Sequence, residues 1–190
     1  VFGTGAKFPA KYQHALFAAD WTYGTLYAIH HRPAGATFIG EKEEFVSGKP
    51  LPLTDLIINP NDGAMYFAVG GRRTQAALYR VTYTGTENTA PTKPAAPTPE
   101  AKLRRSLEVL HAAGTRPEAI ATLWPHLSHA DRFVRTAARV ALEHQLSENW
   151  AERALAERNP QASVEALIAL ARVGQKYLQP RLLDSLSRLD

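Results

Sequence analysis

The sequence predicts a mixed fold in which a β part, a partial β-propeller, is followed by an α-solenoid of helical hairpins. Residues 1–86 hold 13 of the 17 aromatic residues and 10 of the 12 glycines, whereas 87–190 are rich in Ala, Leu, Glu and Arg. The first composition is typical of strands and tight turns, and the second favours helices. Between them TENTAPTKPAAPTPE carries four prolines, which predicts an extended spacer. The expected domains are propeller blades at 1–86, a Pro-rich linker at 87–99 and HEAT-like helical repeats at 100–190.

Six short strands are expected in the first part, each bounded by turn-forming sequence. The separators DWTYG, RPAG, VSGKPLP, NPNDG and GGRRTQ are rich in the residues that turns require. Asp62–Gly63 is the sharpest signal, because a hairpin turn needs a positive φ that glycine adopts without a Cβ clash. The expected strands are 15–19, 25–31, 36–45, 53–59, 64–69 and 76–83.

An internal repeat indicates how these strands are organised. ALFAADWTYGTLYAIHHR and AMYFAVGGRRTQAALYRVTY each contain a strand, a polar loop and a second strand with Leu-Tyr near its start. Such a duplication predicts a repeating β-architecture, and a blade of four strands, A to D from the central channel outward, explains the order. The first three strands become B, C and D of one blade and the next three A, B and C of another, about one and a half to two blades in all. A sandwich or an open meander remains the alternative.

The second half shows helical periodicity. RFVRTAARVALEH and ASVEALIALARVG align at a 30-residue offset, which places Val134 on Val164 and Ala138 on Ile168. Short helices paired at such a spacing predict a HEAT-like solenoid.

Several residues mark the expected helix ends. Pro117, Pro160 and Pro180 fit helix starts, where their missing N–H costs nothing, and Gly114 and Gly174 fit just past helix ends.

A further pair lies at the start of one expected helix. Asp131 is placed to meet the helix dipole and to bridge to Arg135 one turn later.

Composition excludes several functional classes. The absence of cysteine removes disulfides, thiolate nucleophiles and thiolate metal sites. A net charge of +4 is too small to indicate nucleic-acid binding, and no apolar run is long enough for a membrane span. The chain begins at Val1 in loop-like sequence without a signal peptide, so we expect a piece of a larger protein.

The stretches GTGAKFPAKYQHALFAADWTYGTLYAIH and EEFVSGKPLPLTDLIINPNDGAMYFAVGGRRTQAALYRVTY, followed by a Pro-rich linker and DRFVRTAAR, resemble a known family. Its members are large secreted bacterial proteins that join a glucose/sorbosone-dehydrogenase-like β-propeller, HEAT repeats and a PVC-type c-type haem domain. The resemblance implies the end of the propeller and the start of the HEAT segment, with most blades upstream of Val1 and the haem domain downstream. It also implies an extracytoplasmic location, and the remaining blades and the downstream domain of the parent chain as partners.

Blade connectivity predicts a rim where three loops meet. Loops 20–25 and 70–75 both join strands B and C, and 46–53 joins D to A, so all three fall on one face. Arginine pairs bind multiply charged carboxylates, as in a tricarboxylate quinone such as pyrroloquinoline quinone, and aromatic side chains there could stack on a planar ring or a sugar. The alternative is that Asp20 closes a turn, Trp21 packs on a neighbouring blade, and the arginines are solvated or pair with the helical domain. The candidate ligand-binding residues are Asp20, Trp21, Tyr23, Lys49, Arg72, Arg73 and Gln75.

No metal site is predicted. His30 and His31 alternate faces of a strand, and His126 and His129 lie at a helix-to-loop junction without a carboxylate triad. NPNDG has too few ligands for calcium, so a plain turn is expected there. Nucleotide, hydrolase and zinc-protease motifs are absent from the sequence.

These observations predict a non-catalytic structural and interaction segment, a propeller end joined to a HEAT adaptor that offers its surface to a protein partner. The alternative is a part of a quinone- or sugar-type oxidoreductase whose site is completed by missing blades, with a quinone and a c-type haem supplied in the parent protein. Under either hypothesis we expect no catalytic residues and no turnover in this chain alone.

Overall fold

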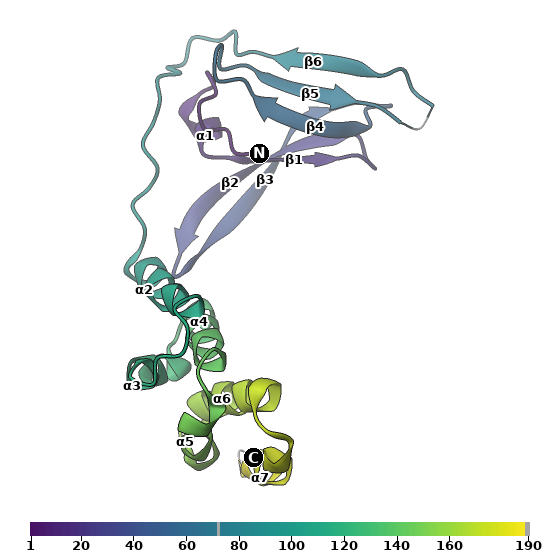
Figure 1. The fold of residues 1–190 in the computed structure, drawn as a ribbon. Coiled ribbons are helices and arrows are strands. Elements are labelled where there is room, and N and C mark those ends of the chain that lie inside the picture. The colour runs from purple at the N-terminus through teal and green to yellow at the C-terminus, as the bar shows by residue number, and fades with distance from the viewer. Residues whose placement is uncertain (72, 189–190) are drawn as a thin grey trace. The chain divides into compact units, whose positions relative to one another are not determined.

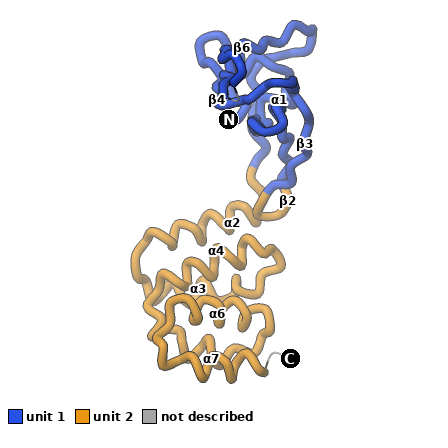
Figure 2. The backbone as a smooth tube through the Cα atoms, turned by 90° about the vertical axis from the view of Figure 1, so that its right-hand side faces the viewer, with its two compact units in different colours: residues 1–33, 38–96 blue, residues 34–37, 97–190 orange. Residues whose placement is uncertain are grey.

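The computed structural model describes residues 1–71 and 73–188 and divides into two compact units (Figures 1 and 2). The first unit comprises 1–33 and 38–96, and the second comprises 34–37 and 97–190. Two three-stranded antiparallel sheets are followed by helices, and neither sheet closes into a barrel. The mixed β-then-α class is therefore confirmed. Within the described ranges, every helix is too short or too polar to cross a bilayer.

The sheets are simple meanders in which neighbouring strands are consecutive in the chain. A short helix, α1 (Ala10–Gln13), precedes the first strand. Each predicted strand overlaps an observed one. The first sheet contains β1 (Leu16–Asp20), β2 (Thr25–Ala34) and β3 (Thr37–Ser47), and the second contains β4 (Leu53–Ile58), β5 (Met65–Val69) and β6 (Ala77–Val81).

The hairpin between β2 and β3 is longer than predicted. The RPAG turn was expected to begin at Arg32, but β2 continues through Pro33 to Ala34. Because β1 pairs with β2 only as far as Ile29, Pro33 lies on a strand edge where no N–H is required.

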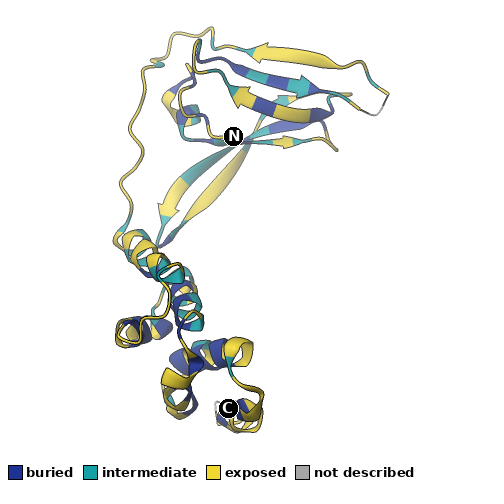
Figure 3. Ribbon diagram, viewed as in Figure 1, coloured by how far each residue is buried: buried dark blue, intermediate teal, exposed yellow. Residues whose placement is uncertain are grey.

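Both sheets contribute to one apolar core (Figure 3). Phe17 lies opposite Ala28 in the first sheet, and Phe67 lies opposite Tyr79 in the second. Cross-strand partners share a face of the sheet, and along each strand every second residue lies on that face. The buried residues of this core are Ala6, Phe8, Ala15, Phe17, Leu26, Ala28, Leu53, Leu56, Met65, Phe67 and Val69.

The first residues of the chain run antiparallel beside β1. Phe2 forms a β-bridge with Leu16, and the Phe17 amide donates to the Val1 carbonyl over 2.7 Å. A Cβ on Gly3 would lie 2.0 Å from the carbonyl oxygen of Tyr12, so only glycine allows this close approach.

The buried side chain of Gln13 binds the start of the Pro-rich segment. Its amide nitrogen donates to the carbonyls of Thr89 and Ala90, and its oxygen accepts the backbone amide and hydroxyl of Thr92. Gln13 is only 4% exposed, and its hydrogen-bonding groups are thereby satisfied. The first residues of the predicted linker are consequently held on the sheet unit.

Six α-helices, joined by short 3-10 turns, follow in the described part of the second unit. Three begin with side-chain caps: Thr98, Asp131 and Asn159 each accept a backbone N–H of the first turn. Pro160 is the first residue of its helix and Gly174 follows the last, as predicted. The helices are α2 (Pro99–Glu108), α3 (Ala119–Leu123), α4 (Arg132–Glu143), α5 (Ala151–Ala156), α6 (Pro160–Val173) and α7 (Gln179–Leu186).

The 30-residue alignment of α4 with α6 is wrong by one position. Val164 and Ile168 were expected to match the buried Val134 and Ala138, yet they are 38% and 40% exposed. Buried positions recur instead at an offset of 29, which places Val134 on Ser163. The same separation joins Glu143 to Arg172 across the two helices. One residue along a helix turns a side chain by about 100°, which explains the exposure of the misaligned pair.

Residues 34–37, the tip of the β2–β3 hairpin, belong to the helical unit. The Asp131 carboxylate accepts the Ala36 amide over 2.7 Å while it caps α4 through the amides of Phe133 and Val134. Burial of this carboxyl raises its pKa, but the three N–H donors outweigh that effect and hold the pKa below its usual range. A Cβ on Gly35, which has a φ of +56°, would lie 2.2 Å from the carboxylate.

The same tip contacts α2. The Thr98 hydroxyl donates to the Gly35 carbonyl over 2.6 Å, and Arg104 donates to the Ala36 carbonyl over 3.3 Å. The Ala36 side chain is 4% exposed and lies in the helical core. The capping residues of two helices therefore also bind this turn.

An alternating ion-pair network connects α4 with α6. Glu165 lies 3.5 Å from Arg135 and 3.0 Å from Arg139, Arg139 lies 3.4 Å from Glu143, and Glu143 lies 2.9 Å from Arg172. The predicted ion pair between Asp131 and Arg135 is not the one formed. The Asp131 carboxylate accepts backbone amides instead, and Arg135 lies beside Glu165. The Nε–H groups of Arg135 and Arg139 are buried without an aligned acceptor, so their attraction to Glu165 is mainly coulombic.

Replacing Gln13 with Ala is expected to accelerate cleavage between Thr86 and Pro99, because residues 89–92 lose their hydrogen bonds to the sheet unit. Limited proteinase K digestion with mass spectrometry measures the rate. Gln75→Ala, at an exposed loop position, is the control. Equal rates for Gln13→Ala and the wild type would show that the side chain does not hold this segment.

Glu165→Gln is expected to destabilise the helical unit by roughly 2–3 kcal/mol, because two largely buried guanidinium groups lose their shared counter-charge. Urea denaturation followed by tryptophan fluorescence reports it, since Trp124 and Trp150 both lie in this unit and are buried. The exposed Glu148→Gln is the matched control. A variant as stable as this control would contradict the role of Glu165.

Candidate functional site

Three loops converge at one end of the sheet unit, as predicted. The indole of Trp21 donates to the Gly70 carbonyl over 3.3 Å, the Gly48 amide donates to the Gly24 carbonyl over 3.1 Å, and the Gly70 amide donates to the Pro52 carbonyl over 3.0 Å. We call residues 20–25, 46–53 and 70–75 the rim. Each loop of the rim is hydrogen-bonded to another.

Two glycines of the rim have the positive φ that favours glycine, and one of them also lies in a close backbone approach. Gly24 has a φ of +67°, and a Cβ there would lie 2.6 Å from the Gly48 carbonyl oxygen. Gly71 has a φ of +92°, and its Cβ position lies 3.5 Å from the Trp21 ring. The backbone conformation at Gly24 in DWTYG and at Gly71 in GGRRTQ therefore favours glycine.

A shallow cavity of about 270 Å³ opens on the rim. Trp21 and Tyr23 contribute aromatic surface, with 42% and 72% of each residue exposed, and Lys49 contributes an ammonium group. Aromatic faces beside one positive charge are suited to an anionic or planar ligand. The lining residues are Trp21, Thr22, Tyr23, Gly24, Gly48, Lys49, Pro50, Leu51 and Pro52.

The remaining predicted rim residues have different roles or positions. Asp20 accepts the amides of Thr22 and Tyr23 at 2.9 and 3.0 Å, so its carboxylate closes the turn. Arg73 and Gln75 are exposed in the third loop but do not line the cavity. Arg72 lies outside the described residues. The structure thus brings Trp21, Tyr23 and Lys49 together.

A cluster of titratable groups that the sequence did not reveal lies where α1 meets β2 and β3. The Glu43 carboxylate lies 2.6 Å from Nε2 of His30 and accepts the Tyr12 hydroxyl over 2.8 Å and the Lys11 ammonium over 3.2 Å. The other ring nitrogen of His30 lies 3.1 Å from the Lys11 carbonyl. We call these four residues the Glu43 cluster.

The Glu43 cluster is internally satisfied. Burial raises the pKa of the Glu43 carboxyl, but hydrogen bonds from His30, Tyr12 and Lys11 outweigh it and hold the pKa below its usual range. Both ring nitrogens of His30 are hydrogen-bonded within the cluster, so neither is left to take a proton from a substrate. These contacts tie α1 to the first sheet.

A second cluster surrounds the NPNDG turn. Asp62 accepts the Ala64 amide at 2.9 Å, the Tyr66 hydroxyl at 2.9 Å and the Arg80 guanidinium at 3.1 Å. The backbone hydrogen bond from Ala64, supported by Tyr66 and Arg80, holds the pKa of this carboxyl below its usual range. The expected plain turn is therefore tied to β5 and β6 by side chains.

The rings of His126 and His129 lie beside each other in the helical unit, with their centroids 6.3 Å apart. Burial and the nearby His129 lower the pKa of His126, and Nδ1 of His129 accepts the Asp131 amide. Over 1–71 and 73–188, no three His, Asp or Glu side chains lie close enough to share a metal ion.

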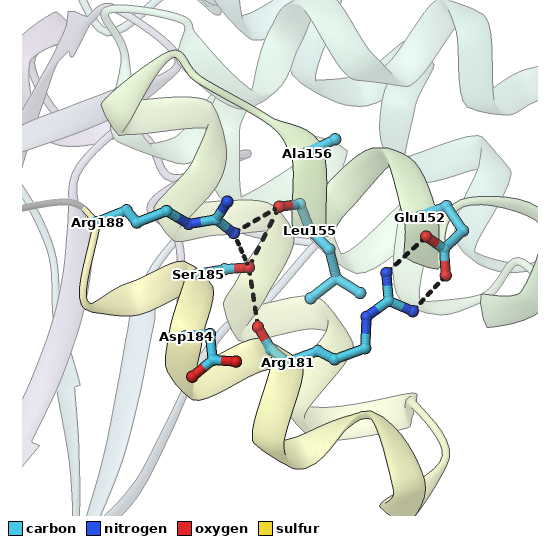
Figure 4. Close-up of a pocket in the computed structure, with 7 residues that line it drawn as sticks. All are labelled: Glu152, Leu155, Ala156, Arg181, Asp184, Ser185 and Arg188. Carbon is cyan, nitrogen blue, oxygen red and sulfur yellow. Dashed lines mark hydrogen bonds and ion pairs between the residues drawn. The ribbon is translucent and has the colours of Figure 1, made fainter.

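A cavity of about 410 Å³ lies between α5 and α7 (Figure 4). Arg181 forms a bidentate pair with Glu152 at 2.6 and 2.7 Å. Arg188 donates to the Leu155 carbonyl and to the Ser185 hydroxyl. Both guanidinium groups of this cavity are therefore already bound to acceptors of the chain itself.

Comparison of the chain with models of protein families, with curated proteins and with solved structures gives no match.

Glu43→Gln is expected to lower the free energy of unfolding by about 1 kcal/mol at neutral pH, since the partly exposed ion pairs are screened. Because the folded-state pKa of Glu43 lies below its ordinary value of 4.5, its contribution is present above that value and is lost as pH falls through the folded pKa. The difference between variant and wild type should therefore shrink in acid. Urea midpoints measured across this range test it, with the neighbouring Glu44→Gln as control. A difference that is constant with pH would contradict the assignment.

Proposed function

We propose that this chain is a non-catalytic structural and interaction segment, formed by blades of a β-propeller and a HEAT-like helical adaptor. The observation that carries the proposal is that three carboxylates already have hydrogen-bond partners. In the described part of the sheet unit, the carboxylates of Asp20, Glu43 and Asp62 are bound to turn amides or neighbouring side chains. A general base needs a free position toward its substrate, and the described residues that line the rim cavity include no carboxylate and no histidine.

Three features of the sheets support the propeller. Residues 1–3 pair with β1 as β4 pairs with β5, which supplies an inner strand A to the first blade. The two sheets share one core. The loops assigned to one face by the blade labels are hydrogen-bonded to one another. The proposed partners of the sheet unit are further sheets of the same repeat.

The helical unit supports the HEAT-like assignment through its spacing. Buried positions, the Glu143–Arg172 contact and the Glu152–Arg181 contact follow a 29-residue period, as expected where each repeat packs on its neighbour. The resemblance to secreted proteins that join such modules agrees with this order and carries the proposed extracytoplasmic location. The exposed helical surface is the proposed site for a protein partner.

The alternative function is a contribution to a quinone- or sugar-type oxidoreductase. The aromatic rings and Lys49 at the rim cavity favour it, because they suit a planar anion. A tricarboxylate quinone carries more negative charge than one ammonium group balances, and Lys49 is the single cation among the described residues that line the cavity. These residues alone do not fit that cofactor, and a c-type haem would belong to the parent protein.

Acrylamide quenching of Trp21 tests whether the rim of this chain binds the quinone by itself. Trp21 is 42% exposed, whereas Trp124 and Trp150 are 5% and 1% exposed, so the quenchable emission comes from the rim. We expect pyrroloquinoline quinone with calcium to leave this quenching unchanged. Trp21→Phe controls for absorption by the quinone, and Lys49→Gln tests specificity. A saturable protection of Trp21 that Lys49→Gln abolishes would overturn the non-catalytic proposal in favour of the oxidoreductase.

A further inference from the structure

The two sheets use equivalent faces differently. The internal repeat aligns the Leu-Tyr of β2 with the Leu-Tyr of β6, so Leu26 corresponds to Leu78. Leu26 is fully buried, whereas Leu78 is 71% exposed. The face that carries Leu26 in the first sheet is therefore covered, whereas the equivalent face that carries Leu78 in the second sheet is exposed.

The covered face belongs to the first sheet and is the one that carries Phe17, Leu26 and Ala28. These residues share a core with Met65 and Phe67 of the second sheet. In the second sheet, Met65 and Phe67 lie on the face opposite to Leu78, because successive residues of a strand alternate and Ala68 is the partner of Leu78. We call the face of Phe17 and Leu26 in the first sheet, and the equivalent face of Leu78 in the second, the front, and the opposite face of each sheet the back. The front of the first sheet thus packs on the back of the second. This contact is head-to-tail, and it leaves a front face free at the other end.

The free front of the second sheet is hollowed, and apolar side chains are exposed on it beside the Arg80–Tyr66 pair. A groove of about 340 Å³ lies over it, and Ile57 beside Leu78 is 56% exposed. Exposed apolar surface of this kind marks an interaction site. The groove is lined by Asp55, Leu56, Ile57, Asn59, Tyr66, Ala68 and Leu78. The yellow arrow of β6 in Figure 3 marks the exposed edge of this sheet.

The back of the first sheet is the matching surface. Phe2 and Phe38 are 56% and 59% exposed there, and both rings pack on His31. Lys42 lies over the Tyr27 ring on the same face. Its charge is opposite to that of Asp55, which lines the groove on the front of the second sheet.

We propose that the front of β4–β5–β6 binds the back of β1–β2–β3 from a second copy of this chain, repeating between chains the contact that the two sheets make within one. Leu78 and Ile57 lie against the Phe2–Phe38 surface, and Asp55 faces Lys42. The contact is heterologous, so each copy retains one free face and association continues beyond a dimer. The inference rests on the proposed function in treating the two sheets as repeats of one stack, and it does not involve the rim.

Sedimentation velocity of the 190-residue chain across micromolar to millimolar concentrations tests this association. We expect the mass to rise from that of the 20.9 kDa monomer with concentration. Leu78→Glu disables the front and Phe38→Glu disables the back, so each variant alone should remain monomeric. Leu183→Glu, which changes a residue 63% exposed on α7, should associate like the wild type.

The decisive sample is an equal mixture of Leu78→Glu and Phe38→Glu. One partner keeps a working back and the other a working front, so the mixture should form a pair of twice the monomer mass and stop there. Association of Phe38→Glu alone, with loss in Leu78→Glu, would indicate a front-to-front contact and overturn the proposal.

A wild type that stays monomeric at every concentration would also overturn it, as expected if a sheet from elsewhere in a longer polypeptide covers the groove. That result would leave the proposed function standing if Trp21 quenching is unchanged by the quinone.

Discussion

Both units depend on the same constraint: a three-stranded sheet or a single helix has an apolar face that only a neighbouring element can cover. Phe17 of the first sheet lies against the rings of Tyr12 and Phe45 and shares one core with Met65 and Phe67 of the second sheet. In the helical unit, Val134 and Ala138 of α4 are completely buried, in a core that α6 helps to build. Burial of such side chains contributes about 1.5–3 kcal/mol each, so neither element is stable alone. Stacking is therefore a condition of folding in each unit.

Polar side chains then determine which segments stack and in what register. Gln13, Glu43 and Asp131 each collect several donors or acceptors from parts of the chain far away in sequence. Leaving such a group unsatisfied costs about 1–3 kcal/mol, so a misplaced segment is penalised more than an apolar contact alone would penalise it. Apolar burial supplies most of the stability, and these polar anchors supply specificity.

Local patterns in the sequence were sufficient for the strands and the turns. Alternation and glycine placement are properties of short segments, and Gly24 and Gly71 are required where the turns were predicted. The Glu43 cluster was missed because Tyr12 and Glu43 are 31 residues apart and only the folded sheet brings them together. The one-residue error in aligning α4 with α6 has a similar origin. Two alanine-rich helices offer several registers of nearly equal apolar match, and the network through Glu165 is formed in the register observed.

The charged and the apolar surfaces of this chain differ in what a partner would have to displace. The charged groups of Arg181 and Glu152, and those of Asp62 and Arg80, form ion pairs within the chain. A charged ligand that binds there would have to displace a partner already in place. Where apolar groups remain exposed, at Leu78 and Ile57, nothing has to be displaced except water. Binding at the second kind of surface gains the full free energy of burial, whereas binding at the first gains only the difference between two ion pairs. Recognition by this chain should therefore begin at its uncovered apolar faces, with charge choosing among the partners that fit.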